Sequence, residues 1–146
     1  MSVNLVSHPL VQAKLSELRT ADTSSHRCRA LVKELALLLG IEASRDLALK
    51  DVPGLKSPIT EYTGKAIAPR LGLSPILRAG IGMTDPMLDL FPEASVFYLG
   101  LFREKVSLQP VEYYQKLPPS PTVDVLYLLD PLIATGGTAI AAISIL

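Results

Sequence analysis

The chain has 146 residues, of which 49% are hydrophobic and 19% are charged, a balance that excludes a charge-rich disordered polymer. Its 14 basic residues equal its 14 acidic ones, so it lacks the positive surplus that nucleic-acid-binding and membrane-surface proteins carry. The single cysteine, Cys28, excludes an intrachain disulfide, and the length predicts one domain over residues 1–146.

The beginning of the chain carries no export signal. The segment MSVNLVSHPLVQAKL has no basic stretch followed by a long apolar core. No apolar run approaches the roughly 20 residues that cross a bilayer. We therefore expect a soluble protein of the cytoplasm.

Two helices are predicted in the first 50 residues. The first begins at Pro9, a residue favoured at the first helical position, and its apolar side chains share one side. The second begins at the capping hydroxyls of residues 23–25 and keeps helical spacing from Cys28 to Leu39. Gly40 is expected to end this helix. The two helices serve either packing within the chain or a contact between subunits.

Two segments look like connections. Residues 51–65 are rich in turn-forming residues and predict a surface connection with one edge strand at most. Residues 110–117, followed by the turn sequence PPSP, predict an extended arm. The sequence leaves open whether Tyr113 and Tyr114 of this arm reach a neighbouring subunit.

Apolar strands alternate with helices after residue 66. Strands are predicted at 73–77, 95–102 and 123–129, and helices at 83–90 and from Ala139 onward. This alternation predicts an α/β fold with a mostly parallel sheet and flanking helices. In such sheets ligands bind beyond the carboxyl ends of the strands, so the residues that follow each strand are the candidates for a site.

The strongest functional pattern is DPLIATGGT, which follows the third strand and precedes a helix. Phosphate groups bind backbone N–H groups at helix N-termini, and glycines let the backbone approach them closely. Gly136 and Gly137 supply that freedom, Thr135 and Thr138 add hydroxyl donors, and Asp130 can bind sugar hydroxyls. The alternative is a glycine turn with a capping threonine. A Walker loop is excluded because no GK[ST] ending follows.

Two arginines follow the other strands. Arg78, in ILRAGIG, comes directly after the first strand, and its forked guanidinium suits a polyanion. Arg103 ends the second strand. If the strands are neighbours, both arginines converge with the 130–138 loop on one crevice. The alternatives are a tight turn with a solvated arginine at Arg78 and a plain surface residue at Arg103.

The chain resembles the uracil phosphoribosyltransferase family over nearly its whole length. The matching segments are HPLVQAKLSELR, PILRAGIGM, GLFRE, PVEYYQKLP and LLDPLIATGGTA. In other phosphoribosyltransferases a second acidic residue usually follows the first aspartate, whereas Pro131 holds that place here, as in the uracil enzymes. The resemblance implies a pentosyl-transferring glycosyltransferase of pyrimidine salvage. It would transfer the phosphoribosyl group of PRPP (5-phosphoribosyl 1-diphosphate) to uracil, giving UMP and pyrophosphate.

The resemblance also implies roles for individual residues. Asp130 would contact the ribose hydroxyls, residues 134–138 would wrap the 5′-phosphate, and Arg78 and Arg103 would bind PRPP. Mg²⁺ would bridge diphosphate and ribose oxygens, held mainly through PRPP rather than by a protein metal site. The predicted PRPP-binding residues are Arg78, Arg103, Asp130, Pro131, Leu132, Ile133, Ala134, Thr135, Gly136, Gly137 and Thr138. Asp130, Arg78 and Arg103 are also predicted to be catalytic.

The end of the chain departs from the family pattern. Residues 139–146 allow only a short helix, and a parallel crossover needs a further strand after it. We therefore expect a domain truncated before the family's uracil-binding segment, a GDAGD-type sequence that does not occur here.

The alternative function is a non-catalytic PRPP- or nucleotide-binding module, or a partner subunit, without a base pocket. The resemblance implies a homodimer or higher homo-oligomer, and some members respond to GTP, but no local motif decides the copy number or this regulation.

Overall fold

The computed structural model describes residues 3–104 and 110–146. Within these residues it contains four helices and seven strands. In chain order they are α1 (Pro9–Leu18), α2 (Ser25–Ala43), β1 (Leu49–Lys56), β2 (Glu61–Ile67), β3 (Leu71–Leu77), α3 (Ile81–Leu90), β4 (Ser95–Val96), β5 (Leu99–Arg103), β6 (Pro110–Gln115), β7 (Val125–Leu129) and α4 (Gly137–Ile145). Across the described ranges, no helix is long and apolar enough to span a membrane.

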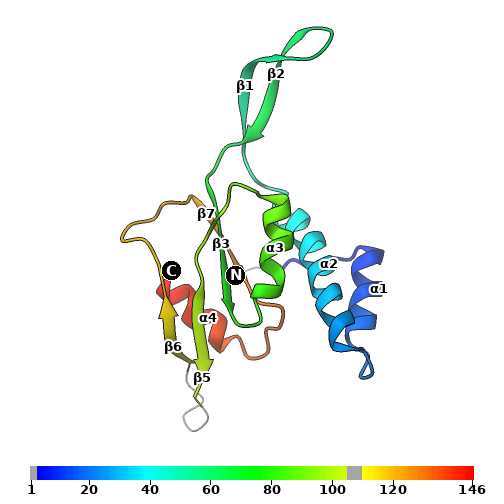
Figure 1. Cartoon of the computed structure of the whole chain (residues 1–146), viewed down its shortest axis with the longest axis vertical. Coiled ribbons are helices and arrows are strands. Elements are labelled where there is room, and N and C mark those ends of the chain that lie inside the picture. The colour runs from blue at the N-terminus through cyan, green and yellow to red at the C-terminus, as the bar shows by residue number, and fades with distance from the viewer. Residues whose placement is uncertain (1–2, 105–109) are drawn as a thin grey trace.

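The predicted α/β class with a mostly parallel sheet is confirmed (Figure 1). β3 lies at the centre, where β7 pairs with it in parallel along one edge and β4 and then β5 pair with it in parallel along the other. β6 runs antiparallel to β5. Parallel pairing brings the carboxyl ends of β3, β5 and β7 to the same end of the sheet.

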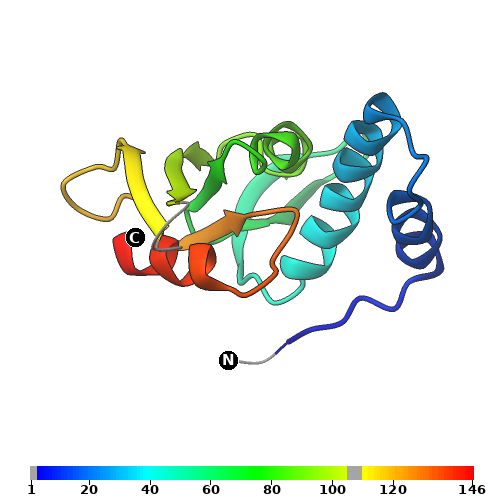
Figure 2. The same ribbon diagram turned by 90° about the horizontal axis from the view of Figure 1, so that it is seen from below.

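Helices cover both faces of this sheet (Figure 2). Leu71 and Leu73 of β3 pack with α2 and α3, whereas Ile76 points to the other face and packs with α4. This alternation is the two-residue period of a strand that is buried on both faces. Leu73 has no exposed surface, and burying a leucine side chain completely stabilises a fold by about 1.5–3 kcal/mol.

The N-terminal helices begin where the sequence predicts. Pro9 occupies the first turn of α1, and Ser24 caps α2 by accepting a hydrogen bond from the Arg27 N–H at 3.2 Å. The predicted end of α2 at Gly40 is wrong, because the helix continues to Ala43. Gly40 lies against α3, where an added Cβ would come within 2.6 Å of the Met87 Sδ. The missing side chain therefore permits close helix packing here rather than ending the helix.

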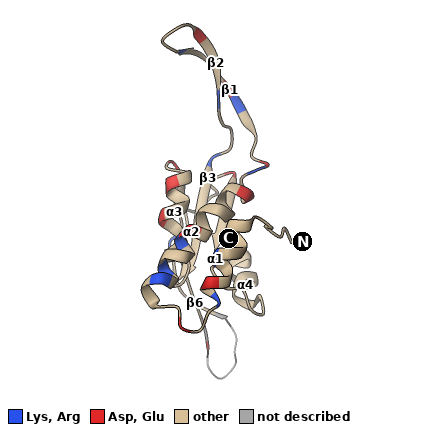
Figure 3. Cartoon of the chain, turned by 90° about the vertical axis from the view of Figure 1, so that its right-hand side faces the viewer, with Lys and Arg blue, Asp and Glu red and all other residues tan. Residues whose placement is uncertain are grey.

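Residues 51–65 lie on the surface as predicted, but they form parts of two paired strands rather than a connection with at most one edge strand. β1 and β2 pair antiparallel in a hairpin that projects away from the sheet and carries both signs of charge (Figures 1 and 3). A β-bulge in β1 contains Gly54, whose φ of 75° favours glycine. The Thr60 N–H donates to the Ser57 hydroxyl at 3.0 Å in the turn. The residues of this segment that are typical of turns therefore lie in the bulge of β1 and in the turn between β1 and β2.

The strand predicted over residues 95–102 is interrupted. β4 and β5 pair with successive parts of β3, and Phe97 between them donates its N–H to the Leu73 carbonyl at 2.8 Å. The buried Ser74 hydroxyl donates to the Phe97 carbonyl at 2.9 Å, so the backbone between β4 and β5 remains hydrogen-bonded to β3. The extended arm predicted over residues 110–117 is confirmed as β6.

Candidate active site

The two strongest sequence patterns meet at one end of the sheet. β3 and β7 pair in parallel up to Pro75 opposite Leu129, and β3 continues to Leu77, so the loops that follow the two strands begin at the same end of the sheet. Arg78 follows β3, and Asp130 follows β7. Between the two loops, the buried Gly80 lies against the last residue of β7. The predicted convergence of the Arg78 turn with the 130–138 loop is therefore present in the structure.

The turn after β3 displays Arg78 to solvent. The Gly80 N–H donates to the Ile76 carbonyl at 2.8 Å, which reverses the chain directly after the strand, and the peptide bond before Arg78 is cis. Arg78 and Ala79 are exposed at the tip of the turn, whereas Gly80 is buried. Within residues 3–104 and 110–146, no carboxylate forms an ion pair with Arg78. Its guanidinium is thus available to an anionic ligand.

The loop after β7 lines a small, partly open cavity of about 130 Å³. Gly136 adopts a left-handed conformation with φ of 78° and directly precedes the first residue of α4, so no side chain of its own caps that helix. Pockets that bind whole small molecules usually exceed about 300 Å³, so this cavity suits one group of a ligand. Its position at a helix N-terminus suits a phosphate. The residues that line it are Asp130, Leu132, Ile133, Ala134, Thr135, Gly136, Thr138 and Ala139.

Compared with the predicted loop residues 130–138, this lining lacks two residues and adds one. Pro131 and Gly137 are predicted to contact PRPP, but neither is among the residues that line the cavity. Ala139 lines the cavity, although it is predicted only as the beginning of the following helix. The helical geometry explains this difference, because the first turn of α4 turns Ala139 toward the loop. The general rule that helix N-termini bind phosphate is the signal that could have found it.

Asp130 lies half-buried at the mouth of this loop. Burial raises the pKa of its carboxyl, and the hydrogen bond from the Leu132 N–H, at 3.4 Å, opposes that rise. The contact at this distance is a weak one, so the carboxylate keeps acceptor capacity for a further donor. Sugar hydroxyls are donors of that kind.

Arg103 is the third predicted site residue. It ends β5, which pairs with β3 at the positions Leu77 and Gly100. Its backbone therefore lies at the same end of the sheet as Arg78 and Asp130. The Arg103 side chain falls outside the described residues, so its contact with PRPP stays a prediction.

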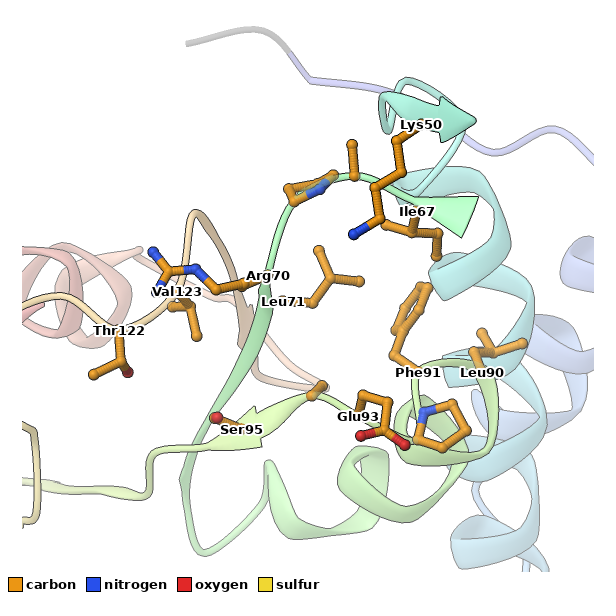
Figure 4. Close-up of a pocket in the computed structure, with 14 residues that line it drawn as sticks. Lys50, Ile67, Arg70, Leu71, Leu90, Phe91, Glu93, Ser95, Thr122 and Val123 are labelled. Atoms are coloured by element: carbon orange, nitrogen blue, oxygen red, sulfur yellow. The ribbon is translucent and has the colours of Figure 1, made fainter. Parts of the chain in front are cut away.

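A larger cavity, of about 510 Å³, lies at the opposite end of β3 (Figure 4). Phe91 and Leu71 line it together with the charged residues Lys50, Arg70 and Glu93. Arg70 is already held by Asp124, with Nη2 and Oδ1 2.8 Å apart. Ligands of parallel sheets bind beyond the carboxyl ends of the strands, and this cavity adjoins their amino ends. The 130–138 loop therefore remains the candidate site.

Comparisons with known proteins point to one family. The family model for uracil phosphoribosyltransferase matches residues 5–146. The uracil phosphoribosyltransferase of Roseiflexus castenholzii is 52% identical over 144 residues, which is 99% of this chain and 69% of the relative. The corresponding enzyme of Desulfitobacterium hafniense is 49% identical over 145 residues, with the same two coverages. That of Streptococcus pneumoniae is 47% identical over 142 residues, or 97% of this chain and 68% of the relative.

A solved structure shares the whole fold. The AQ2163 protein from Aquifex aeolicus superimposes with a TM-score of 0.89 at 32% sequence identity, covering 98% of this chain and 68% of that chain. The family model, the relatives and the shared fold thus agree with one another. On these grounds the chain belongs to the uracil phosphoribosyltransferase family.

Proposed function

We propose that this chain transfers the phosphoribosyl group of PRPP to uracil at the carboxyl ends of β3 and β7, forming UMP and pyrophosphate. The observation that supports the proposal is that the loop after β3 and the loop after β7 lie side by side and offer different ligand-binding groups. One offers the exposed guanidinium of Arg78, and the other offers a phosphate-sized cavity beside the Asp130 carboxylate. PRPP carries a diphosphate on C1′ and a phosphate on C5′, so a single molecule needs both kinds of loop.

The chemistry of the transfer assigns a role to each loop. The bond between C1′ and the diphosphate oxygen breaks, and its electron pair leaves with pyrophosphate. Uracil N1 then bonds to C1′, and the proton of its N–H passes to the solvent. Arg78 and Arg103 stabilise the negative charge of the departing pyrophosphate, and Asp130 lies near the ribose, where positive charge develops. The cavity holds the 5′-phosphate and thereby fixes the position of C1′.

Mg²⁺ belongs to this proposal as a companion of PRPP. No group of three or more His, Cys, Asp or Glu side chains is arranged to hold a metal ion in the described part of the chain. Diphosphate and ribose oxygens are hard ligands that suit Mg²⁺, and Asp130 is the carboxylate that lines the cavity. When bound, the ion neutralises charge on the leaving pyrophosphate.

A homo-oligomer in the cytoplasm is the working state in this proposal. Apolar side chains on the projecting hairpin support association, because Leu49, Ile59 and Tyr62 are exposed there and Ile59 is 95% accessible. Leu10 of α1 and Ile41 of α2 are exposed as well, so the N-terminal helices offer a second surface. Regulation by GTP stays a prediction from the family resemblance.

Product analysis tests the proposed reaction. The chain is incubated with PRPP and Mg²⁺, with and without uracil, and UMP and pyrophosphate are quantified by chromatography and a coupled assay. Equal amounts of UMP and pyrophosphate that depend on uracil would support the proposal. Transfer to hypoxanthine or orotate instead would contradict the assigned base. PRPP binding without any transfer would favour the non-catalytic binding module.

Matched variants at the two ends of β7 locate the reaction. Asp130→Asn removes the negative charge beside the ribose, and we expect the rate of transfer to fall by about 10²-fold or more. Asp124→Asn makes the same change at the amino end of the strand, beside Arg70, and should leave the rate nearly unchanged. Equal loss in both variants would contradict the placement of the site.

A further inference from the structure

Gly80 is buried and closely surrounded by backbone atoms, although Arg78 and Ala79 just before it are exposed. An added Cβ at this position would lie 2.4 Å from the Leu129 carbonyl oxygen, and 2.7 and 2.9 Å from the backbone N and O of Ile76. All three are backbone atoms, which cannot rotate away as the end of a side chain can. The turn that carries Arg78 therefore presses directly on the last residue of β7.

The same glycine is held from the other side by α3. The buried Thr84 hydroxyl donates to the Gly80 carbonyl at 3.3 Å, and the Met83 N–H donates to that carbonyl at 3.0 Å. Leu129 immediately precedes Asp130 in the chain. Gly80 is thus fixed between the helix that supports the Arg78 turn and the strand that ends at the 130–138 loop.

We propose that Gly80 is a positioning residue that sets the spacing between these two loops, so that one PRPP molecule contacts both. The inference rests on the proposed function, in which the Arg78 turn binds the diphosphate and the 130–138 loop binds the 5′-phosphate. A Cβ must move from 2.4 Å to at least 3.0 Å from the Leu129 oxygen, a shift of about 0.6 Å. A misplacement of about 1 Å can cost about 10²-fold in the rate of an enzyme.

A ligand that spans both loops separates this role from general stability. Ribose 5-phosphate carries the group for the 130–138 loop alone, and pyrophosphate carries the group for the Arg78 turn alone. A change in spacing leaves each loop intact, so each of these smaller ligands still binds. PRPP is the ligand that loses contacts, because its two anionic groups are joined through one ribose ring.

Gly82 provides a matched control in the same motif. An added Cβ there meets the Val32 Cγ1 at 3.4 Å, which is ordinary van der Waals contact. Neither glycine has a positive φ, so alanine strains the backbone at neither position. Gly80→Ala and Gly82→Ala therefore add the same methyl group, two residues apart, and differ in what it meets.

Calorimetric titration of the full chain tests the inference with PRPP and Mg²⁺, ribose 5-phosphate and pyrophosphate. For Gly80→Ala we expect the Kd of PRPP to rise by about 10- to 100-fold, as for the loss of one hydrogen bond to a charged group, while the Kd values of the two smaller ligands change by less than about twofold. For Gly82→Ala we expect all three Kd values to stay within about twofold of the original chain. Circular dichroism confirms that each variant is folded.

Several results would overturn the inference. Gly80→Ala binding PRPP as well as the original chain would exclude a spacing role, and so would equal losses for all three ligands. If Gly80→Ala does not fold, Thr84→Val decides, because it removes one of the two donors to the Gly80 carbonyl and leaves the Met83 N–H in place. We then expect a PRPP-specific loss of about two- to tenfold, and no such loss would refute the role. An original chain that binds none of the ligands would refute the proposed function and this inference with it.

Discussion

Arg78→Ala is the substitution that most directly tests the candidate site. The guanidinium is exposed and forms no ion pair with any residue in the described ranges, so its removal leaves no partner charge uncompensated. The free energy of unfolding should therefore change by no more than about 0.5 kcal/mol, as at other unconstrained surface positions. Ligand binding should change far more, because in the proposed site this cation meets a diphosphate.

The size of the binding loss follows from the lost contact. A hydrogen bond to a charged group contributes about 1.5–3 kcal/mol, which corresponds to about a 10- to 150-fold increase in the Kd of PRPP. Arg78→Lys keeps the charge but loses the planar fork, so its Kd should fall between those of the original chain and the alanine variant. Calorimetry measures the Kd, and urea unfolding measures the stability of the same samples.

Arg70→Ala is the control at the other end of β3. Its guanidinium binds the Asp124 carboxylate and lies far along the strand from Arg78. We expect this variant to lose stability and keep its affinity for PRPP, the reverse of Arg78→Ala. The reasoning is refuted if Arg78→Ala binds PRPP as the original chain does, or if Arg70→Ala loses PRPP affinity to the same extent.

Two further predictions concern stability. Leu73→Ala shortens a fully buried side chain in the central strand, and the cavity it leaves should lower the free energy of unfolding by about 2–5 kcal/mol in urea titrations. A loss below about 1 kcal/mol would contradict the packing. Hydrogen bonds from the Arg70 side chain, and then from its backbone, lower the pKa of Asp124 from its usual 3.8 to about 2. A lowered pKa stabilises the fold above pH 3.8, and this contribution is lost as the pH falls from there toward 2. Asp124→Asn should thus be less stable than the original chain at pH 6, with the difference shrinking between pH 4 and 2; a constant difference in thermal midpoint would count against the ion pair.

Local patterns in the sequence predict most of the elements, because their causes are local. Pro9 and Ser24 begin helices through their own backbone and side-chain chemistry, and the apolar run of β7 predicts a buried strand. Where the prediction fails, a partner distant in the sequence decides. Glycine is typical of helix ends, but at Gly40 the side chains of Met87 and Leu90 pack against the helix, which continues to Ala43.

The hairpin of β1 and β2 and the interruption between β4 and β5 also depend on partners outside their own segments. The turn-forming residues of 51–65 are compatible with a loop or with a bulged hairpin, and strand pairing selects the hairpin. The interruption at Phe97 follows from the contacts of its backbone with Leu73 and Ser74, more than 20 residues earlier. Neither outcome has a signature within a few residues of the position concerned.

For the site, the sequence by itself determined the chemistry. It supplied an arginine after one strand, an aspartate after another, and a glycine-threonine loop before a helix, in the order that the family shares. The tertiary structure decided which of these groups meet and at what spacing. The parallel register of Pro75 with Leu129 brings the two loops to the same end of the sheet, and the close approach of Gly80 to the Leu129 carbonyl, which leaves no room for a Cβ, sets their separation in our proposal. Hydrogen-bond register and backbone packing join residues about 50 positions apart, so they arise only when the whole sheet has formed.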